Sequence, residues 1–247
     1  MSSTTLRMRL GIRAVGSSCY QVFSPLALSF GGNVLAMLLS LPIVLVSIVA
    51  ASAVHSLSLV PLGIALLVGA LPNPACMGLQ TLARELARGQ TADLREQWQG
   101  LRMYWRVSLR AWLIAAAVTL TCVLNMAFYG TQAANPAARF HAVAAPLFVV
   151  WTLILFLWLG VNLYVAPLLL AQAEARALLA YRNAAVVMLS RPVASVTVSL
   201  VWLGALVFTS ATALATVIGL ALAASIQQNT LRLLLPNLLP TPGLPTQ

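Results

Sequence analysis

The scarcity of charged residues is the feature that most constrains this chain. Only 7% of its 247 residues are charged, while 61% are hydrophobic. A soluble domain carries about 25% charged residues, so this chain lacks the polar groups to cover its own surface in water. Lipid therefore has to solvate much of it. The sequence predicts an all-α, polytopic transmembrane helical bundle.

The apolar runs predict five to six membrane segments, because each span needs about 20 apolar residues. Four separate runs are the expected spans 26–51, 59–79, 111–129 and 145–170. A further run, 192–226, would measure about 50 Å as one helix, which exceeds a hydrocarbon core of about 30 Å. We expect it to form two spans, or one span plus a re-entrant segment, with a bend at the small polar cluster 209–212.

The expected organisation is a single transmembrane helical domain, residues 26–230. A basic N-terminal segment, 1–25, precedes it, and a Pro-rich C-terminal tail, 231–247, follows it.

The basic residues predict the orientation. All 14 are arginine, and they gather before the first span, between the second and third, and between the fourth and fifth. Basic residues collect on cytoplasmic loops, so the N-terminus and the polar stretches 81–110 and 172–191 are expected in the cytoplasm. The lipid bilayer is therefore the main partner that we expect for this chain. This distribution fits membrane topology better than nucleic-acid binding, which we do not expect.

The stretch 94–110 is predicted to be an amphipathic cytoplasmic helix between spans two and three. Tryptophans and leucines recur on one face, and arginines follow the same spacing about 100° away. Two interpretations stay open: anchoring in the headgroup layer, or docking of a partner protein. The candidate residues for either are Arg95, Trp98, Arg102, Trp105 and Arg106.

Amides and prolines inside the apolar runs are a second set of candidates. Buried amides either join helices through hydrogen bonds or line a polar path, and prolines kink or unwind a span. We expect the Pro72-Asn73-Pro74 sequence to break the end of span two. The candidate polar or helix-break positions are Asn33, Pro42, Pro72, Pro74, Asn162 and Pro167.

Enzyme activity is not expected. All four acids lie in predicted cytoplasmic stretches, and the two histidines are isolated at predicted outer turns. Proton relays and intramembrane metalloproteases need acids or an HExxH motif within the membrane. The three cysteines lack metal-ligand spacing, so we predict no metal and no cofactor.

Several segments, in order, resemble one family. The stretch Asn33 to Pro42 is similar to an Asn-Leu-x-Trp…Leu-Pro pattern, with Ala36 where the family often has tryptophan. The segment 69–75 resembles a glycine-then-Pro-Ala segment, although Pro72-Asn73 is unusual there. Further matching positions are Arg88-Gly89, Trp98, Arg102, Tyr104-Trp105, Ser108-Leu109, 164–169 and Arg191-Pro192. Together they resemble the YesL-like family of bacterial integral membrane proteins, domain of unknown function 624.

That resemblance implies a role rather than a reaction. Members often accompany genes for carbohydrate ABC transporters, which implies a non-enzymatic accessory or regulatory component of sugar uptake with transporter subunits as partners. The alternative is a permease subunit or small transporter, whose path would be lined by proline-broken helices.

Overall fold

The computed structural model describes residues 31–32, 34–36, 38, 72–88, 93–211 and 220–235, with side chains omitted for 206–211. This part of the chain is helical and contains no strand, which confirms the all-α class. Its helices are α4 (Pro74–Ala87), α5 (Leu94–Ala134), α6 (His141–Ala171), α7 (Ala177–Ser190), α8 (Pro192–Ala211) and α9 (Leu220–Leu234).

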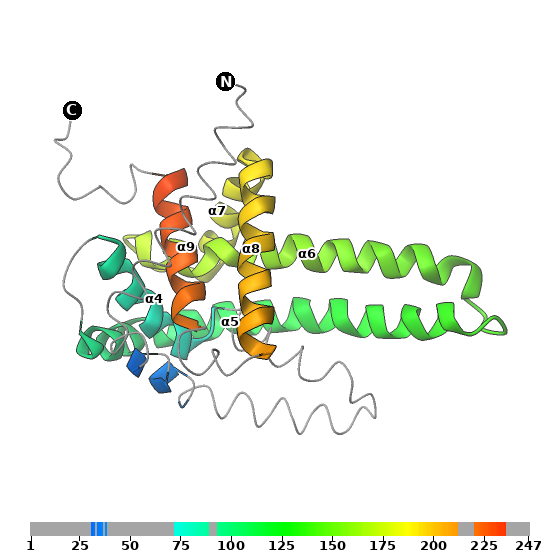
Figure 1. The fold of residues 1–247 in the computed structure, drawn as a ribbon, viewed down its shortest axis with the longest axis horizontal. Helices are drawn as coiled ribbons and strands as arrows, with labels where there is room; N and C mark the ends of the chain where they lie inside the picture. The colour runs from blue at the N-terminus through cyan, green and yellow to red at the C-terminus, as the bar shows by residue number, and fades with distance from the viewer. Residues whose placement is uncertain are drawn as a thin grey trace.

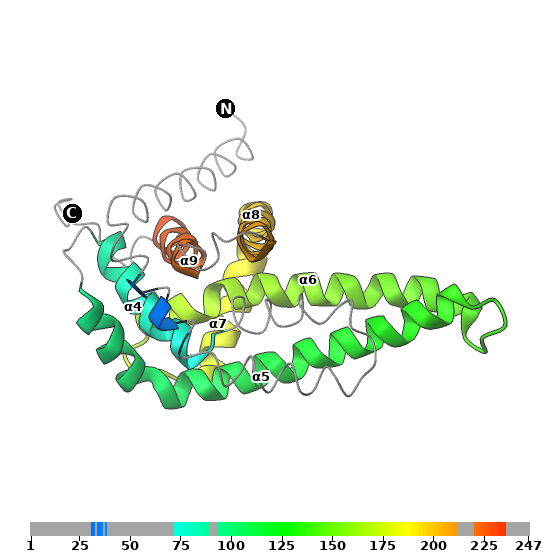
Figure 2. The same cartoon turned by 60° about the horizontal axis from the view of Figure 1, so that its bottom comes forward.

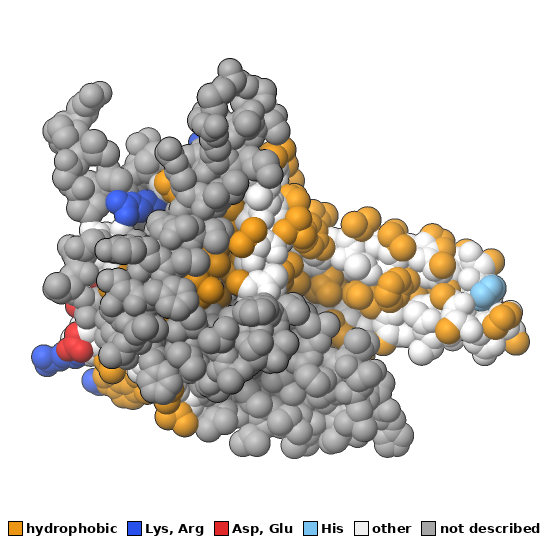
Figure 3. All heavy atoms as spheres, viewed as in Figure 1, with side chains coloured by type: hydrophobic (Ala, Val, Ile, Leu, Met, Phe, Trp, Pro, Cys, Tyr) orange, Lys and Arg blue, Asp and Glu red, His pale blue; other side chains and the backbone are white. Residues whose placement is uncertain are grey.

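The α5–α6 hairpin dominates the shape. The two helices lie side by side and project from the other helices, as both views show (Figures 1 and 2). α5 runs for 41 residues because it contains no proline until the Asn135-Pro136 turn ends it. The hairpin is coated with apolar side chains, whereas the charged side chains visible in Figure 3 lie mainly at the opposite end.

α5 and α6 are long and apolar enough to cross a membrane, and they contain the expected spans 111–129 and 145–170. α7 and α8 pass the same test only as a pair, bent by 111° at Arg191. The described part of the chain thus holds two or three candidate spans, and these helices indicate a membrane protein. Most of the expected spans 26–51 and 59–79 lies outside the described residues, so a total of five or six stays a prediction.

The remaining helices form a compact base at the root of the hairpin. α4 packs along the first part of α5 and against α9, while α7 packs against α6. Its core contains Leu163, Leu169 and Trp202, all fully buried. Figure 1 shows α8 lying across the direction of the hairpin rather than along it, and Figure 2 shows the same helix nearly end-on above α6.

The Pro72-Asn73-Pro74 sequence starts a helix, because Pro72 and Asn73 are not helical and α4 begins at Pro74. The expected break in span two falls at this helix start, but residues 59–71 lie outside the described residues, so the break stays a prediction. Asn73 has an extended backbone, and its side-chain oxygen accepts a hydrogen bond from the Cys76 N–H at 2.8 Å. Pro74 occupies the first turn, where the missing N–H costs nothing. α4 then continues to Ala87, well past the predicted end of span two at residue 79.

Two further expectations differ from the local structure that is observed. α6 runs through Pro167 to Ala171, so this proline does not break the helix. Pro167 lacks the N–H that would bond the Leu163 carbonyl, yet the helix continues for four residues beyond it. α8 ends at Ala211, within the cluster 209–212. α9 is a separate helix that extends to Leu234, so the first residues of the 231–247 segment are helical.

Two glycines allow α4 and α5 to approach each other. A Cβ atom added to Gly78 would lie 2.5 Å from the backbone oxygen of Gln97. One added to Gly100 would lie 2.3 Å from the Thr81 hydroxyl. Gly78 is the tighter constraint, because the atom it meets is backbone and cannot rotate away. The α4–α5 contact therefore depends on this position lacking a side chain.

We predict that Gly78→Ala lowers the free energy of unfolding by about 1–3 kcal/mol, as overpacked sites do. Gly204→Ala is the matched control, because an added Cβ there meets nothing within 4 Å. Thermal unfolding of both variants in detergent measures the difference. Equal melting temperatures for the two variants would contradict a close α4–α5 contact.

Candidate functional site

The first half of α5 presents its predicted candidate residues outward. Trp98 and Trp105 are 47% and 46% exposed, and Arg95, Arg102 and Arg106 are exposed as well. We call these five residues the basic face of α5. The opposite side, which carries the buried Gln97, Gly100 and Ser108, packs inward.

This segment is not a separate surface helix, and the expected boundary near residue 110 is absent. The backbone continues as one helix into the hairpin. The stretch between residues 100 and 130 contains neither proline nor glycine, so nothing in it ends a helix. The basic face and the apolar hairpin therefore share one rigid axis.

Among the described residues, the arginines of this face form no ion pair with an acidic side chain. The ion pairs in the described part of the chain join Arg88 to Glu85 and Arg176 to Glu174, on other elements. The Arg106 guanidinium lies over the Trp105 ring, 5.4 Å from its centroid. Positive charge is thus left uncompensated along this side of the helix.

Charge stops abruptly along α5. Arg110 is exposed, and Leu113, three residues later, is 54% exposed. No charged residue follows until Arg139, beyond the hairpin tip. Residues 111–134 measure about 36 Å as a helix, enough to cross a hydrocarbon core of about 30 Å. Arg110 therefore marks one edge of the apolar part of the hairpin.

On α6 the same edge appears as a change in burial. The residues from 142 to 157 are mostly exposed, whereas those from Leu159 to Leu170 are almost all buried. At this level Tyr181 of α7 joins the two hairpin helices. Its hydroxyl lies 2.9 Å from the Ala111 carbonyl oxygen and 3.3 Å from Asn162 Oδ1.

The surroundings of Tyr181 give Asn162 a structural role. The Asn162 amide donates to the Trp158 carbonyl at 2.9 Å, and the Tyr181 ring stacks on Trp158 at 5.2 Å between centroids. Asn162 is 1% exposed, and both ends of its amide are hydrogen-bonded. The geometry accounts for this buried amide through contacts between helices.

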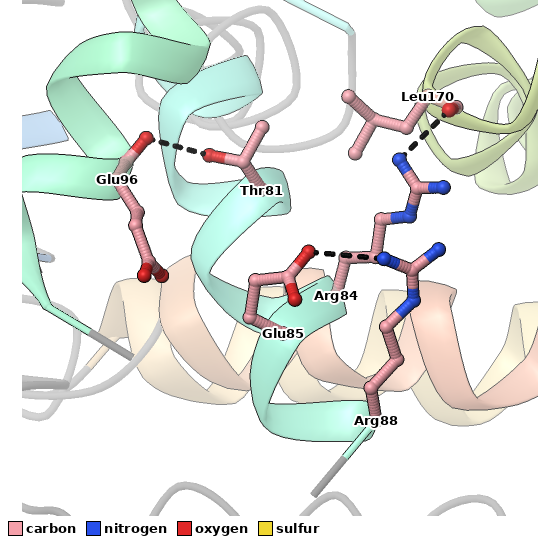
Figure 4. Close-up of polar contacts among 6 residues, drawn as sticks. All are labelled: Thr81, Arg84, Glu85, Arg88, Glu96 and Leu170. Carbon is pink, nitrogen blue, oxygen red and sulfur yellow. Dashed lines mark hydrogen bonds and ion pairs between the residues drawn. The ribbon is translucent and has the colours of Figure 1, made fainter. Parts of the chain in front are cut away.

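Arginines from neighbouring helices cap two helix ends in the base. Arg84 donates to the Leu170 carbonyl oxygen at 2.9 Å, near the end of α6 (Figure 4). Arg232 of α9 donates to the Ala87 carbonyl oxygen at the end of α4. A cation at a helix C-terminus is stabilised by the helix dipole. Burial lowers the pKa of the Arg84 guanidinium, and the nearby Arg88 lowers it further.

A cluster of buried amides joins α4 to α9. Gln80 donates to Gln227 and accepts from Gln228 at 2.8 Å. Beside it lies a cavity of about 10 Å³, lined in part by Cys76 and Gln227. Such a volume holds about one water molecule, so it leaves no room for a sugar or another metabolite.

The remaining candidates are distributed as follows. Pro72 is buried and lines the small cavity, beside the Asn73 cap and Pro74. Asn33 and Pro42 lie outside the described residues. The structure does not bring the basic face together with Asn162 or Pro167, which lie in the base and at its edge. They form separate features rather than one site.

Sequence reasoning missed the glutamine cluster and the arginine caps. The signal for the first was the polar run from Gln227 to Thr230, which directly follows the apolar segment that was expected to end at residue 226. No comparable pattern points to the caps, since each depends on two helices meeting end to side.

Comparisons with protein-family models, curated proteins and solved structures find no match for this chain. Within the described residues, no group of three or more His, Cys, Asp or Glu side chains is placed to hold a metal ion.

We predict that Tyr181→Phe lowers the free energy of unfolding by about 1–3 kcal/mol, because it leaves the buried Asn162 and Ala111 oxygens without this donor. Tyr129→Phe is the control, since the Tyr129 hydroxyl makes no hydrogen bond within the described part of the chain. Unfolding in detergent, followed by tryptophan fluorescence, measures both. A Tyr181→Phe variant as stable as the control would contradict the proposed joint between α5, α6 and α7.

Proposed function

We propose that this chain is a non-enzymatic integral protein of the bacterial cytoplasmic membrane that serves as an accessory subunit. In this proposal the α5–α6 hairpin holds it in the bilayer, and the part of the basic face farthest from the hairpin, at Arg95, Trp98 and Arg102, docks a partner in the cytoplasm. The observation that carries the proposal is the row of exposed arginines without acidic partners, flanked by half-exposed tryptophans. Arginine and tryptophan are the residue types enriched where protein partners bind most tightly.

The resemblance to the YesL-like family supports a partner of one kind, a component of carbohydrate ABC uptake. The matching positions Trp98, Arg102 and Trp105 belong to the basic face itself. A transporter component with an acidic surface would complement these arginines.

A permease subunit or small transporter is the second candidate, favoured by the buried Gln80, Gln227 and Gln228 amides. In the conformation described, these amides bond to one another and the adjoining cavity is tiny. Transport would therefore need α4 and α9 to separate. Purified protein in liposomes that accumulates no sugar, with or without an ATPase partner, would reject this candidate.

The docking proposal predicts position-specific crosslinking in intact cells. A photo-crosslinking amino acid at Trp98 is expected to capture a sugar-transporter component. The same group at Leu178, which is 74% exposed on α7, is expected to capture none. Arg95→Glu should reduce the Trp98 crosslink about tenfold, because reversing a charge at an interface costs more than about 1.4 kcal/mol. Crosslinks of equal yield from both positions, or none to a transporter from Trp98, would overturn the proposal.

A further inference from the structure

We infer that the end of α5 nearest the hairpin binds the phosphate of an anionic phospholipid through Arg106 and Arg110. Trp105 and Leu113 contact the lipid beside that phosphate. The inference rests on the membrane placement of the hairpin within the proposed function, and it does not depend on a transporter partner.

Arg106 and Arg110 share one side of α5 at a spacing that one phosphate can bridge. Arg106 and Arg110 are one helical turn apart, about 6 Å along the axis, and therefore lie on the same side of α5. Both are exposed, and neither makes an ion pair within the described part of the chain. Guanidinium groups donate paired hydrogen bonds to phosphate oxygens.

Neutralisation by the chain's own acids is weak at this place. Glu96, the nearest acid before these arginines on α5, lies ten residues before Arg106, about 15 Å along the helix. That separation exceeds a Debye length of about 8 Å at physiological ionic strength. Glu85 and Glu174 are already paired with other arginines. The positive charge of Arg106 and Arg110 is therefore available to bind an external anion.

The apolar side of the site distinguishes a lipid from a soluble anion. Leu109 is 36% exposed and Leu113 is 54% exposed, and they flank Arg110 along the helix. From Leu113 onward the exposed surface of α5 is apolar, including Leu120 and Leu124. A phosphate held at Arg110 places acyl chains along these leucines, so the surface fits a ligand that is anionic at one end and apolar at the other.

Trp105 supports the same placement. It is 46% exposed, and the Arg106 guanidinium lies over its ring, 5.4 Å from the ring centroid. Tryptophan concentrates at the level of lipid headgroups, where its ring is apolar and its N–H is wet. Its contact also restrains the Arg106 guanidinium close to the helix.

The test uses the purified full chain, reconstituted in phosphatidylcholine nanodiscs or micelles and titrated with phosphatidylglycerol. Bound lipid is counted by native mass spectrometry. Arg106→Gln with Arg110→Gln should weaken phosphatidylglycerol binding about 30-fold, or about 2 kcal/mol at about 1 kcal/mol for each arginine near the lipid phosphate. Phosphatidylcholine binding should be weak in the wild-type protein and in this double variant. Arg106→Lys with Arg110→Lys should retain part of the affinity, since charge remains but the paired donors are lost.

The matched control is Arg95→Gln with Arg176→Gln, which removes the same charge from exposed positions away from the boundary. An equal loss of binding in this control would overturn the site, because general electrostatic attraction would explain the result. Equal binding of phosphatidylglycerol and phosphatidylcholine would also overturn it. So would competition by millimolar inorganic phosphate or glycerol 3-phosphate, which would indicate a site for a soluble anion.

This experiment contains no transporter, so its failure leaves the docking proposal standing. Failure of the Trp98 crosslink likewise leaves the lipid site standing.

Discussion

The backbone of α5 satisfies its own hydrogen bonds across 41 residues, from the polar base to the tip of the hairpin. In hydrocarbon an unpaired N–H or carbonyl costs several kcal/mol, so a crossing segment has to be an unbroken helix or part of a closed barrel. Because the same helix continues below the membrane edge, it fixes where its arginines stand relative to lipid. The positions of Arg106 and Arg110, and the contact with α4, all follow from this single rigid element.

The division of polar groups between hairpin and base has a physical cause. In the outer part of the hairpin, Thr121 and Thr152 donate to backbone carbonyls of their own helix one turn earlier. The base instead uses polar groups between helices, in the glutamine cluster and the two arginine caps. Such contacts resist separation of the helices, because each buried amide or carbonyl would lose its partner. The base therefore holds its helices in a more closely defined arrangement than the outer hairpin does.

Much of this arrangement was predictable, and the exceptions have identifiable reasons. Composition indicates a helical membrane chain, and the long apolar runs at 111–129 and 145–170 fall inside α5 and α6. The outward position of Trp98 and Trp105 followed from helical spacing. At Pro72-Asn73-Pro74 the prolines indicated an interruption, and the asparagine cap with the proline in the first turn defines the start of α4 there. Pro167 was expected to break a span, but its turn of α6 is buried among neighbouring helices, whose contacts offset the lost backbone hydrogen bond.

Contacts between distant segments were beyond the reach of sequence patterns. Nothing in the residues around Arg232 reveals that it meets Ala87, or that Tyr181 meets Ala111. These contacts depend on how four helices are placed around the root of the hairpin, and single-helix periodicity carries no such information.

The Arg232 cap has a consequence for biosynthesis. Arg232 and Ala87 are 145 residues apart in the sequence, so the end of α4 is synthesised long before the side chain that caps it. At about 5–20 residues per second, roughly 7–30 seconds pass between the two during translation. A similar time separates the synthesis of Gln80 from that of its partner Gln228, 148 residues later. The hairpin is therefore available for membrane insertion while α4 is still uncapped, and the base closes only when the last helix has been synthesised.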